Sequence, residues 1–502
     1  MEQNSRSRRT DYPKRYGKNQ VASEKILNYI DGRMFQPSSG KWLDNFEPAT
    51  GSVYSQVPDS DGTDVDLAIQ SANAAFDHWS QMDPMNRAAI LNRVADRIDQ
   101  NLDALVAAES RDNGKPEWLA RSVDIPRSSK NIRFFANMST GLSSQSHSER
   151  GSINYTLRKP LGAVGCITPW NLPLYLLTWK IAPALAVGNT VVAKPAEVTP
   201  MTAYLFSQIC IDAGLPPGVL NIVHGSGAET GNALINHSDL KAISFTGGTK
   251  TGRHIASVVA PQLKKFALEL GGKNPNVIFA DCDYQRTLQT TLRSSFANQG
   301  QICLCGSRVY IQDSLYEKFR DDFVEEAMKI KVGDPQQADS KLGAVVSKPH
   351  FEKILSCIDR AKQEGGTILC GGQAAKVEGR CSEGWFVQPT VIEGLSNNCQ
   401  TNQEEIFGPV VTLQPFSDAE HAIELANGTE YGLSASIWTA DINRAHEVAD
   451  RIESGVIWIN SWLLRDLRTP FGGMKQSGVG REGGMEGIRF WTEPKNVCVN
   501  FG

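Results

Sequence analysis

The sequence predicts an α/β protein built from two doubly wound parallel sheets and a small β arm. From residue 160 onward, short apolar runs that end at glycine, threonine or proline alternate with helical stretches. Six such runs cover residues 163–167, 190–193, 220–223, 242–245, 276–279 and 309–311. Their starts lie 22 to 34 residues apart, the length of a βα unit, and continuous apolar strands that alternate with helices are typical of parallel sheets. The alternation resumes over residues 341–470, so a second sheet is expected.

The first 140 residues hold the other predicted elements. Residues 28–60 are short extended pieces with a turn at Asp31-Gly32, a pair that favours a tight hairpin. Apolar residues at helical spacing predict three helices, over residues 65–79, 88–109 and 122–138.

Two alternating segments far apart in the chain predict the β arm. The polar, serine-rich stretch 139–158 ends in Ile153-Asn-Tyr-Thr-Leu157, and the C-terminal Asn496-Val-Cys-Val-Asn500 alternates in the same way. Both are typical of exposed edge strands, so we expect them to pair with each other or with another subunit.

Composition excludes several classes of protein. A chain of 502 residues is too long for one ordinary core, and a net charge of −4 indicates neither a nucleic acid nor a membrane partner. No stretch approaches the roughly 18 apolar residues of a membrane helix. Ten cysteines without a C-x-x-C pair argue against a metal site and favour free thiols in a reducing compartment. We therefore expect no metal and a cytoplasmic protein.

The N-terminal segment predicts a basic tail. Residues 1–20 carry six basic and two acidic residues and no apolar run, which excludes a secretory signal. A transit peptide is the alternative, but the acidic residues and Pro13 disfavour an amphipathic helix. We expect residues 1–24 to be disordered and solvated.

Cys303 is the candidate nucleophile. An unpaired cysteine is usually a small buried hydrophobe, but this one follows a Gly-Gln pair, and Glu269 lies upstream between two leucines and before a glycine pair. Apolar surroundings raise the pKa of a carboxyl group, which suits a general base. Thiol and carboxylate, with a nucleotide-binding region between residues 160 and 252, predict covalent oxidation of a carbonyl.

Two glycine-rich loops predict the nucleotide site. Residues 245–252 follow an apolar strand and open a helix, so backbone N–H groups and the helix N-terminus can meet a phosphate. Neither this loop nor residues 225–231 has the G-x-G-x-x-G spacing, and each alone also fits a tight turn. Glu197 follows another strand and can accept hydrogen bonds from both ribose hydroxyls, which favours NAD over NADP. The alternative for Glu197 is a solvated helix start.

Asn171 is the candidate oxyanion donor. It carries the one side-chain amide in Pro169-Trp-Asn-Leu-Pro173, a loop fixed by two prolines. An amide N–H near Cys303 would stabilise a developing oxyanion. The alternative is that Asn171 only closes an Asx turn.

These residues stand in motifs that resemble the aldehyde dehydrogenase superfamily over about residues 25–500. Seven motifs occur in the order and spacing of that family: Pro169-Trp-Asn-Leu-Pro, Lys194-Pro-Ala-Glu, Phe245-Thr-Gly, Leu268-Glu-Leu-Gly-Gly-Lys, Gly300-Gln-Ile-Cys303, Glu404-Glu-Ile-Phe-Gly-Pro409 and Pro470-Phe-Gly-Gly473. The resemblance implies the fold of that family and a homodimer or homotetramer. The implied units are an NAD-binding domain of residues 25–138 and 159–270, a catalytic domain of residues 271–483, and an oligomerisation arm of residues 139–158 and 484–502.

The resemblance also implies the roles of site residues. It makes Cys303 the nucleophile, Glu269 the base, Asn171 the oxyanion donor and Lys180 a lysine that helps to tune the thiol. NAD is the implied cofactor, with Lys194 and Glu197 at the adenosine ribose, Glu405 at the nicotinamide ribose and Phe407 beside the ring. The expected cofactor contacts are Thr168, Pro169, Trp170, Lys194, Glu197, Gly227, Gly231, Phe245, Thr246, Gly247, Gly248, Thr249, Gly252, Glu405 and Phe407. The family often has serine at the position of Gly248, so one hydroxyl contact to the pyrophosphate is missing.

The implied reaction is oxidation of an aldehyde to a carboxylic acid through a thiohemiacetal and a thioester on Cys303. The run Trp462-Leu-Leu-Arg-Asp-Leu-Arg-Thr-Pro-Phe-Gly-Gly and the segment Asp124-Ile-Pro-Arg127 are similar to those of the 2-hydroxymuconic and 2-aminomuconic semialdehyde dehydrogenases. Arginine binds carboxylates through two parallel hydrogen bonds. Arg121 and Arg465 would then hold the carboxylate at the far end of such a substrate, with Asn171 as a third substrate contact at the aldehyde, unless these arginines only form surface or interdomain ion pairs.

Other functions remain as alternatives. A broad-specificity or CoA-acylating aldehyde dehydrogenase would share fold, thiol and cofactor, although a CoA-acylating enzyme has less need of a base at Glu269. A non-enzymatic nucleotide-binding protein would not need the thiol, amide and carboxylate together. A cysteine hydrolase would need a histidine to activate the thiol, and the nucleophile and base motifs contain none.

Overall fold

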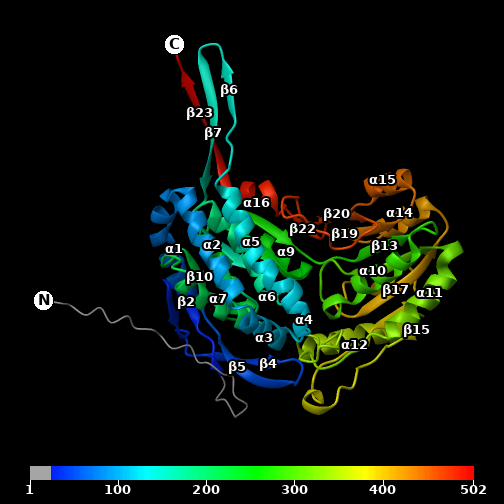
Figure 1. Ribbon diagram of the computed structural model, residues 1–502. Coiled ribbons are helices and arrows are strands. Elements are labelled where there is room, and N and C mark those ends of the chain that lie inside the picture. The colour runs from blue at the N-terminus through cyan, green and yellow to red at the C-terminus, as the bar shows by residue number, and fades with distance from the viewer. Residues whose placement is uncertain (1–23) are drawn as a thin grey trace.

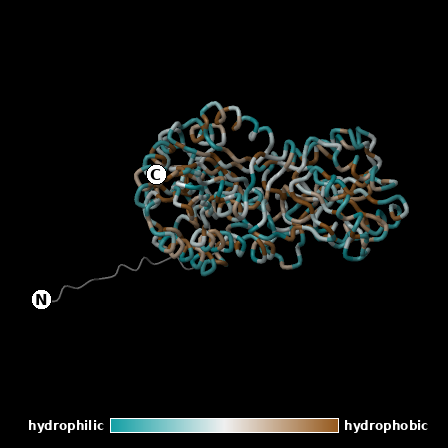
Figure 2. The backbone as a smooth tube through the Cα atoms, turned by 90° about the horizontal axis from the view of Figure 1, so that it is seen from above, coloured by the Kyte–Doolittle hydropathy of each residue, from teal (hydrophilic) through white to brown (hydrophobic). Residues whose placement is uncertain are grey.

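The computed structural model describes residues 24–502 and has two α/β lobes side by side, with a narrow β arm projecting from the first (Figure 1, Figure 2). The predicted disordered tail, residues 1–24, lies outside the described residues except for its last residue. The predicted fold class is confirmed, because each lobe is organised around a largely parallel sheet flanked by helices.

The first sheet carries the glycine-rich loops and has the strand order β22-β12-β11-β8-β9-β10-β2-β3. Its strands are β2 (Asn28–Ile30), β3 (Arg33–Phe35), β8 (Ala163–Ile167), β9 (Thr190–Lys194), β10 (Leu220–Ile222), β11 (Ala242–Thr246), β12 (Lys265–Glu269) and β22 (Gly478–Val479). Strands β8 to β12 run parallel. The chain order reverses between β8 and β11, and such a switch point is where open α/β sheets bind ligands.

Two details of this sheet bear on the predictions. The β2–β3 hairpin turns at the predicted pair, with Asp31 and Gly32 at φ of 51° and 71°. Strand β22 pairs antiparallel with β12, so the chain returns to the first sheet within the range expected to belong to the catalytic domain.

Helices cover both faces of the first sheet (Figure 1). They are α1 (Gly62–Gln81), α2 (Pro84–Gln100), α3 (Leu102–Asn113), α4 (Glu117–Leu119), the π-helix η1 (Ala120–Asp124), α5 (Ile125–Ser139), α6 (Pro173–Ala186), α7 (Met201–Asp212), the π-helix η2 (Gly227–Gly231), α8 (Asn232–Asn236), α9 (Thr249–Val259) and the 3-10 helix η3 (Ala260–Gln262). The single helix predicted over residues 88–109 is wrong. The Asn101 side chain donates to the carbonyl of Arg97 at 2.8 Å and ends α2, as an amide that competes with the helix backbone can do.

The second sheet has the order β15-β16-β17-β14-β13-β19-β20, and all its neighbours are parallel except β15 and β16. Its strands are β13 (Asn274–Ile278), β14 (Gly306–Gln312), β15 (Thr367–Cys370), β16 (Thr390–Glu393), β17 (Val410–Phe416), β19 (Ser434–Trp438) and β20 (Val456–Ile459). The helices that follow β13 are α10 (Tyr284–Phe296), η4 (Ala297–Gly300), α11 (Asp313–Met328), α12 (Lys348–Gln363), η5 (Gly379–Cys381), α13 (Gln400–Gln403), α14 (Ala419–Asn427), α15 (Ile442–Arg451) and α16 (Gly484–Phe490). The candidate nucleophile lies between η4 and β14.

The arm is a three-stranded antiparallel sheet of β6 (Ser146–Glu149), β7 (Ser152–Pro160) and β23 (Thr492–Asn500). The two predicted edge strands therefore pair with each other, from Pro160 opposite Thr492 to Ser152 opposite Asn500. Two smaller sheets complete the fold, one of β1 (Glu24–Lys25), β4 (Trp42–Glu47) and β5 (Ser52–Pro58), the other of β18 (Tyr431–Gly432) and β21 (Met474–Lys475).

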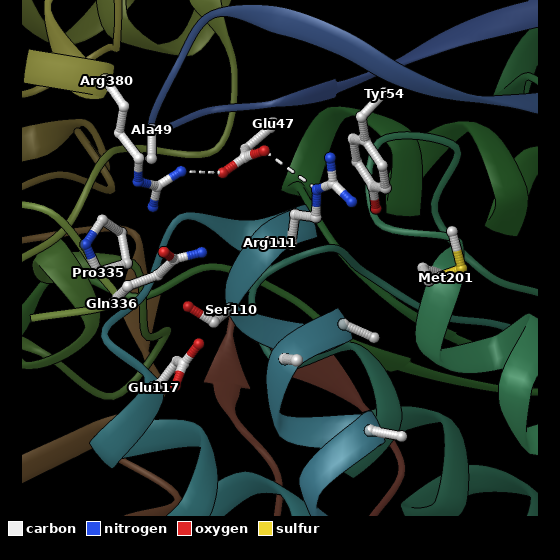
Figure 3. A pocket seen from close by; sticks show the side chains of 13 residues that line it. Glu47, Ala49, Tyr54, Ser110, Arg111, Glu117, Met201, Pro335, Gln336 and Arg380 are labelled. Atoms are coloured by element: carbon white, nitrogen blue, oxygen red, sulfur yellow. Dashed lines mark hydrogen bonds and ion pairs between the residues drawn. The ribbon is translucent and has the colours of Figure 1, made fainter. Parts of the chain in front are cut away.

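The lobes are held against each other by apolar and ionic contacts. The main apolar core continues from the α5–α6 layer to Ile302 and Leu304 beside the candidate nucleophile. At a surface hollow of about 390 Å³, Glu47 of β4 accepts from Arg111 at 3.0 Å and from Arg380 of the second lobe at 2.6 Å (Figure 3). Within residues 24–502, no helix combines the length and the apolar character that crossing a bilayer requires.

Candidate active site

A strained loop carries the candidate nucleophile. Asn298, Gln299 and Gly300 adopt positive φ values of 51°, 58° and 70° in succession, a conformation that only glycine adopts without cost. A Cβ on Gly300 would lie 2.0 Å from the carbonyl oxygen of Gly408, so glycine is required there. The Gln301 side chain accepts from the N–H of Val346 at 3.1 Å. The Gly-Gln pair before Cys303 therefore fixes the position of the thiol.

Cys303 lies where two cavities meet. A cavity of about 290 Å³ is lined by Cys303 together with Trp170, Gly247 and Glu405. A second cavity, of about 380 Å³, is lined by the same cysteine together with Glu269 and a largely apolar wall. One sulfur atom is thus reachable from two chambers, which is what a reaction between two separately bound molecules requires.

The loop that follows β8 holds Asn171 beside Cys303. The buried Asn171 side chain donates from Nδ2 to the carbonyl of Gln301 at 3.0 Å. The backbone carbonyl of Asn171 accepts from the side chain of Asn298 at 3.1 Å and from the ammonium of Lys115 at 3.1 Å. One Nδ2–H thus fixes the amide to the Cys303 loop. The structure brings the predicted oxyanion donor and the predicted nucleophile to the same cavity wall.

Glu269 ends β12 and faces the larger cavity. It is buried, and neither carboxyl oxygen has a hydrogen-bond partner among the described residues. Burial raises its pKa well above the usual value, and Glu482 raises it further, whereas Lys180 and Arg465 lower it. Gly472 of the Pro-Phe-Gly-Gly motif packs on this group, since a Cβ there would lie 2.8 Å from Oε1. Glu269 is therefore a buried carboxyl group whose raised pKa suits it to accept a proton.

Lys180 is paired with Glu482. Its Nζ donates to Glu482 at 2.7 Å and to Ser244 at 2.9 Å. Its charge also lowers the pKa of Glu269. Burial raises the pKa of Cys303, followed by the negative charges of Glu405 and Glu269, and Arg465 lowers it. The expected tuning of the thiol by Lys180 stays a prediction.

The smaller cavity fits the nicotinamide end of a dinucleotide. It lies at the carboxyl ends of β8 and β11, where the Oγ1 atoms of Thr168 and Thr246 are buried without a hydrogen-bond partner among the described residues. Gly248 leaves open space, since a Cβ there would meet nothing within 4 Å. Glu405 accepts from the N–H of Gly272 at 2.9 Å. Free donors, open backbone and a fixed carboxylate match the polar groups of such a ligand.

The predicted cofactor contacts other than Thr168 fall into three sets. Phe245 and Gly252 support the loop instead of lining the cavity, because Gly247 packs directly on the Phe245 ring and Gly252 packs on a leucine side chain. The predicted contacts that line the cavity are Pro169, Trp170, Thr246, Gly247, Gly248, Glu405 and Phe407. The remainder, Lys194, Glu197, Gly227, Gly231 and Thr249, lie in the adjoining β9 loop, η2 and the start of α9.

Within that remainder, the Lys194 ammonium bonds to Glu197 at 3.1 Å, and Gly231 lies next to the Lys194 side chain. This places the expected ribose-binding pair at the end of β9, next to the N–H that Thr168 donates to the Lys194 carbonyl at 3.1 Å.

Sequence reasoning missed His350, which completes an aromatic wall with the expected Trp170 and Phe407. His350 at the start of α12 packs edge-on against Trp170 at 5.0 Å between ring centroids, and Phe407 packs on Trp170 at 5.2 Å. The His350 ring bonds to the Phe407 carbonyl at 2.7 Å, and burial lowers the pKa of His350 to about 4. Phe407 itself has φ of 62°. The one sequence signal for this contact was His350 itself, an isolated histidine outside all the motifs.

The two predicted substrate arginines are not brought together. Arg465 lines the larger cavity, where its guanidinium lies 3.8 Å from the ring centroid of Phe471 and bonds to the hydroxyl of Tyr175 at 3.3 Å. Arg121 is on η1, and its guanidinium is paired with Asp103 at 2.7 Å and half-exposed. The expected clamp is thus represented by Arg465, while Arg121 does not line the cavity and pairs with Asp103 at the surface.

Known proteins similar to this chain agree with this geometry. The model of the aldehyde dehydrogenase family matches residues 35–497. The 2-aminomuconic semialdehyde dehydrogenase of Danio rerio is 48% identical over 480 residues, covering 94% of this chain and 98% of the relative. The 2-hydroxymuconic semialdehyde dehydrogenase of Pseudomonas sp. (strain CF600) is 43% identical over 483 residues, covering 95% and 99%. A solved NAD+ complex of aldehyde dehydrogenase from Bacillus cereus has a TM-score of 0.93 at 38% identity and covers 95% of this chain and 97% of that chain. The chain therefore belongs to the aldehyde dehydrogenase family.

Proposed function

We propose that this protein oxidises a carboxylate-bearing aldehyde to the corresponding acid, with NAD as hydride acceptor and Cys303 as the nucleophile. The observation that carries the proposal is the position of the Cys303 thiol between the glycine-lined cavity and the cavity that contains Glu269 and Arg465. The relatives named as muconic semialdehyde dehydrogenases and the neighbour solved with NAD+ support it.

The dinucleotide would be held by Trp170, Gly247, Gly248 and Glu405, with Lys194 and Glu197 at the adenosine ribose. When bound there, the nicotinamide supplies a hydride acceptor. Glu197 favours NAD over NADP, because its carboxylate would repel a 2′-phosphate.

The chain supplies the remaining chemistry. The Cys303 thiol loses its proton to water, and the thiolate sulfur attacks the aldehyde carbon. A C–S bond forms while the C=O π bond opens to an oxyanion. The side-chain amide of Asn171 and the N–H of Cys303 stabilise that oxyanion. The C–H bond then breaks, its electron pair leaves as hydride, and a thioester remains on sulfur. Glu269 takes a proton from water, the water oxygen attacks the thioester carbon, and breaking the C–S bond releases the acid and regenerates the Cys303 thiolate.

We assign recognition of the negative charge of the substrate to Arg465. Arg465 and Arg293 line the larger cavity, and neither has a carboxylate partner among the described residues. Arg293 donates to the backbone carbonyl of Trp462 at 3.2 Å, whereas Arg465 donates to the hydroxyl of Tyr175 at 3.3 Å. A guanidinium in that position suits a carboxylate at the far end of the substrate. Arg121 would contact the same carboxylate only after its ion pair with Asp103 breaks. The choice between an amino and a hydroxy semialdehyde does not change this requirement, because both substrates share the carboxylate.

The test is a steady-state assay of NADH formation with 6-oxohexanoate and with hexanal, which have equal chain lengths and differ in charge. We expect a higher kcat/KM for the acid and little activity with NADP. Mass spectrometry of enzyme quenched during turnover should find the acyl group on Cys303. Turnover without that adduct, or equal kcat/KM for both aldehydes, would reject the corresponding part of the proposal.

A broad-specificity enzyme is the second candidate. The acetaldehyde dehydrogenase of Pseudomonas aeruginosa is 40% identical over 480 residues, so a relative at comparable similarity is named for a small neutral aldehyde. The same assay separates the two, since a broad enzyme would turn over hexanal and the acid alike.

We further propose the domain division, oligomerisation and location expected from the sequence. The arm sheet has exposed strands at its outer edge, which supports assembly into a homodimer or homotetramer through the arm. All ten cysteines are free thiols, which supports a cytoplasmic location. Size-exclusion chromatography with light scattering, before and after deletion of residues 492–502, tests the assembly.

A further inference from the structure

The C-terminal end of helix α3 contacts the loop that carries Asn171. Asn113, the last residue of α3, donates from Nδ2 to the carbonyl of Trp170 at 2.9 Å and to that of Asn171 at 3.4 Å. Lys115, two residues further on, donates from its ammonium to the carbonyl of Asn171 at 3.1 Å. Both side chains are fully buried, so water does not compete for these bonds.

The Lys115 ammonium makes three hydrogen bonds, one for each of its N–H groups. Two are donated to carboxylates, to Glu109 at 3.2 Å and to Asp124 at 2.9 Å, and the third is donated to the Asn171 carbonyl. Buried ions of opposite charge give little net stability compared with apolar side chains of the same volume. The bond to the catalytic loop, in contrast, is one that no apolar side chain could make.

These bonds bear on the catalytic amide because the Asn171 backbone fixes where its side chain starts. Asn298 donates to the same Asn171 carbonyl at 3.1 Å and to the Gln301 carbonyl at 3.2 Å, and the Asn171 amide donates to the Gln301 carbonyl at 3.0 Å. One Nδ2–H of Asn171 is thus held on the loop of Cys303, and the other is left for an oxyanion. A misplacement of about 1 Å in such a group costs on the order of 100-fold in rate.

The residue between Asn113 and Lys115 contacts the second lobe. Gly114 ends α3 with φ of 84°, and its carbonyl accepts from the N–H of Ala344 at 3.0 Å. The Ala344 carbonyl accepts in turn from the side chain of Gln299, in the strained loop before the thiol, at 2.9 Å. Three consecutive residues of the first lobe are therefore bonded, directly or through one residue, to both catalytic loops.

We propose that the turn Asn113-Gly114-Lys115 sets the position of the oxyanion donor relative to the thiol, with Asn113 and Lys115 as positioning residues for Asn171. This inference rests on the role of Asn171 in the proposed function. Neither Asn113 nor Lys115 lines the two cavities that meet at Cys303, so both act through the loop and not by contact with substrate or cofactor.

The experiment is a double-mutant cycle that compares Lys115→Met in the wild-type and in the Asn171→Ala background. The readout is the rate of NADH formation in a single turnover at saturating NAD, with 6-oxohexanoate and with hexanal. We expect Asn171→Ala to slow this rate by about 100- to 1,000-fold and Lys115→Met to slow it by roughly 10- to 100-fold. Within the Asn171→Ala background, Lys115→Met should change the rate by less than about twofold, because the group that it positions is gone. The Kd of NAD, measured by calorimetry, should stay within about twofold in Lys115→Met.

Lys264→Met is the matched control. Lys264 is also a buried lysine that donates to two backbone carbonyls, of Ile235 at 3.0 Å and of His237 at 2.7 Å. It precedes β12, at the opposite end of that strand from Glu269, so its substitution should leave the single-turnover rate within about twofold of the wild type.

A merely structural role would give a different result. If Lys115→Met slows the reaction by the same factor in both backgrounds, or does not slow it in the wild-type background, the proposed function stands and the inference is wrong. If Asn171→Ala reacts as fast as the wild type, the oxyanion role in the proposed function fails, and the inference fails with it. Lys115→Met leaves two buried carboxylates without their cation. If that variant does not fold, the same cycle with Asn113→Ala, which keeps the charged cluster intact, decides by the same criteria.

Discussion

Lys115, Glu109 and Asp124 form a buried charged cluster between the Asn171 loop and the larger cavity. This cluster predicts that the free energy of unfolding depends on pH. The Lys115 ammonium lies 3.2 Å from Glu109, 2.9 Å from Asp124 and 3.1 Å from the carbonyl of Asn171. Its side chain and those of both acids are at most 1% exposed. Asp124 also lines the larger cavity. One ammonium therefore serves two carboxylates and one catalytic loop.

The perturbation is Glu109→Gln, which removes one titrating group and nearly preserves the shape. Burial raises the pKa of Glu109 from 4.5 to about 7, the charge of Lys115 opposes this shift, and that of Asp124 adds to it. Because the folded pKa lies above the unfolded one, the stabilisation by the protonated form is complete below about pH 4.5 and is lost as the pH rises through about 7. The shift of about 2.5 pKa units corresponds to about 3 kcal/mol.

The assay is guanidinium unfolding at pH 5, 6, 7 and 8, monitored by tryptophan fluorescence at one protein concentration. We expect the midpoint of the wild-type enzyme to fall with pH relative to that of Glu109→Gln, with a difference in unfolding free energy that grows by about 3 kcal/mol over the window. The exposed Glu229→Gln is the matched control and should follow the wild type. A difference between Glu109→Gln and wild type that does not change with pH would refute the reasoning, since Glu109 would then ionise as an ordinary carboxyl group.

Three further predictions concern the reaction. Cys303→Ala should abolish NADH formation, whereas Cys305→Ala should retain most of it. The reason is that Cys305 lines neither of the two cavities that meet at Cys303, and its thiol faces the carbonyl of Ala297 at 3.9 Å. Stopped-flow and steady-state assays of both variants would reassign the nucleophile if the order reversed. Glu269→Gln should keep the pre-steady-state NADH burst but slow turnover by about 100- to 10,000-fold, and loss of the burst would give Glu269 another role. Gly248→Ser should tighten NAD binding by about two- to tenfold, measured by calorimetry, because its backbone φ of −71° and the open space around it accept a side chain; unchanged or weaker binding would contradict this.

The strands of the first sheet were predictable because buried parallel strands are continuous apolar runs bounded by glycine and proline. The prediction for residues 163–167 matches β8, and those for 190–193 and 242–245 each fall one residue short. Strand β12 escaped the same reasoning, since Lys265-Phe-Ala-Leu-Glu269 begins and ends with charge. Its last residue, Glu269, is charged because it reaches the larger cavity.

The site was predictable where one motif supplies one group, as at Cys303 and Asn171. It was not predictable where local backbone geometry decides which side chain faces inward. The π-helix η1 inserts a wider turn before α5, and π-turns shift the register of the side chains that follow. Arg121 lies within this π-helix and pairs with Asp103, an orientation that residue spacing in the sequence does not reveal.

The catalytic groups depend on the docking of the lobes more than on either lobe alone. Asn171 and Glu269 come from the ends of first-sheet strands, whereas Cys303 and Arg465 come from second-lobe loops. Lys180 of α6 bonds to Glu482, a residue far along the chain, at 2.7 Å, and Glu482 in turn raises the pKa of Glu269. A displacement between the lobes would therefore change the charge on the base and the distance to the thiol together, so the apolar core that crosses the junction at Ile302 and Leu304 has a catalytic as well as a stabilising role.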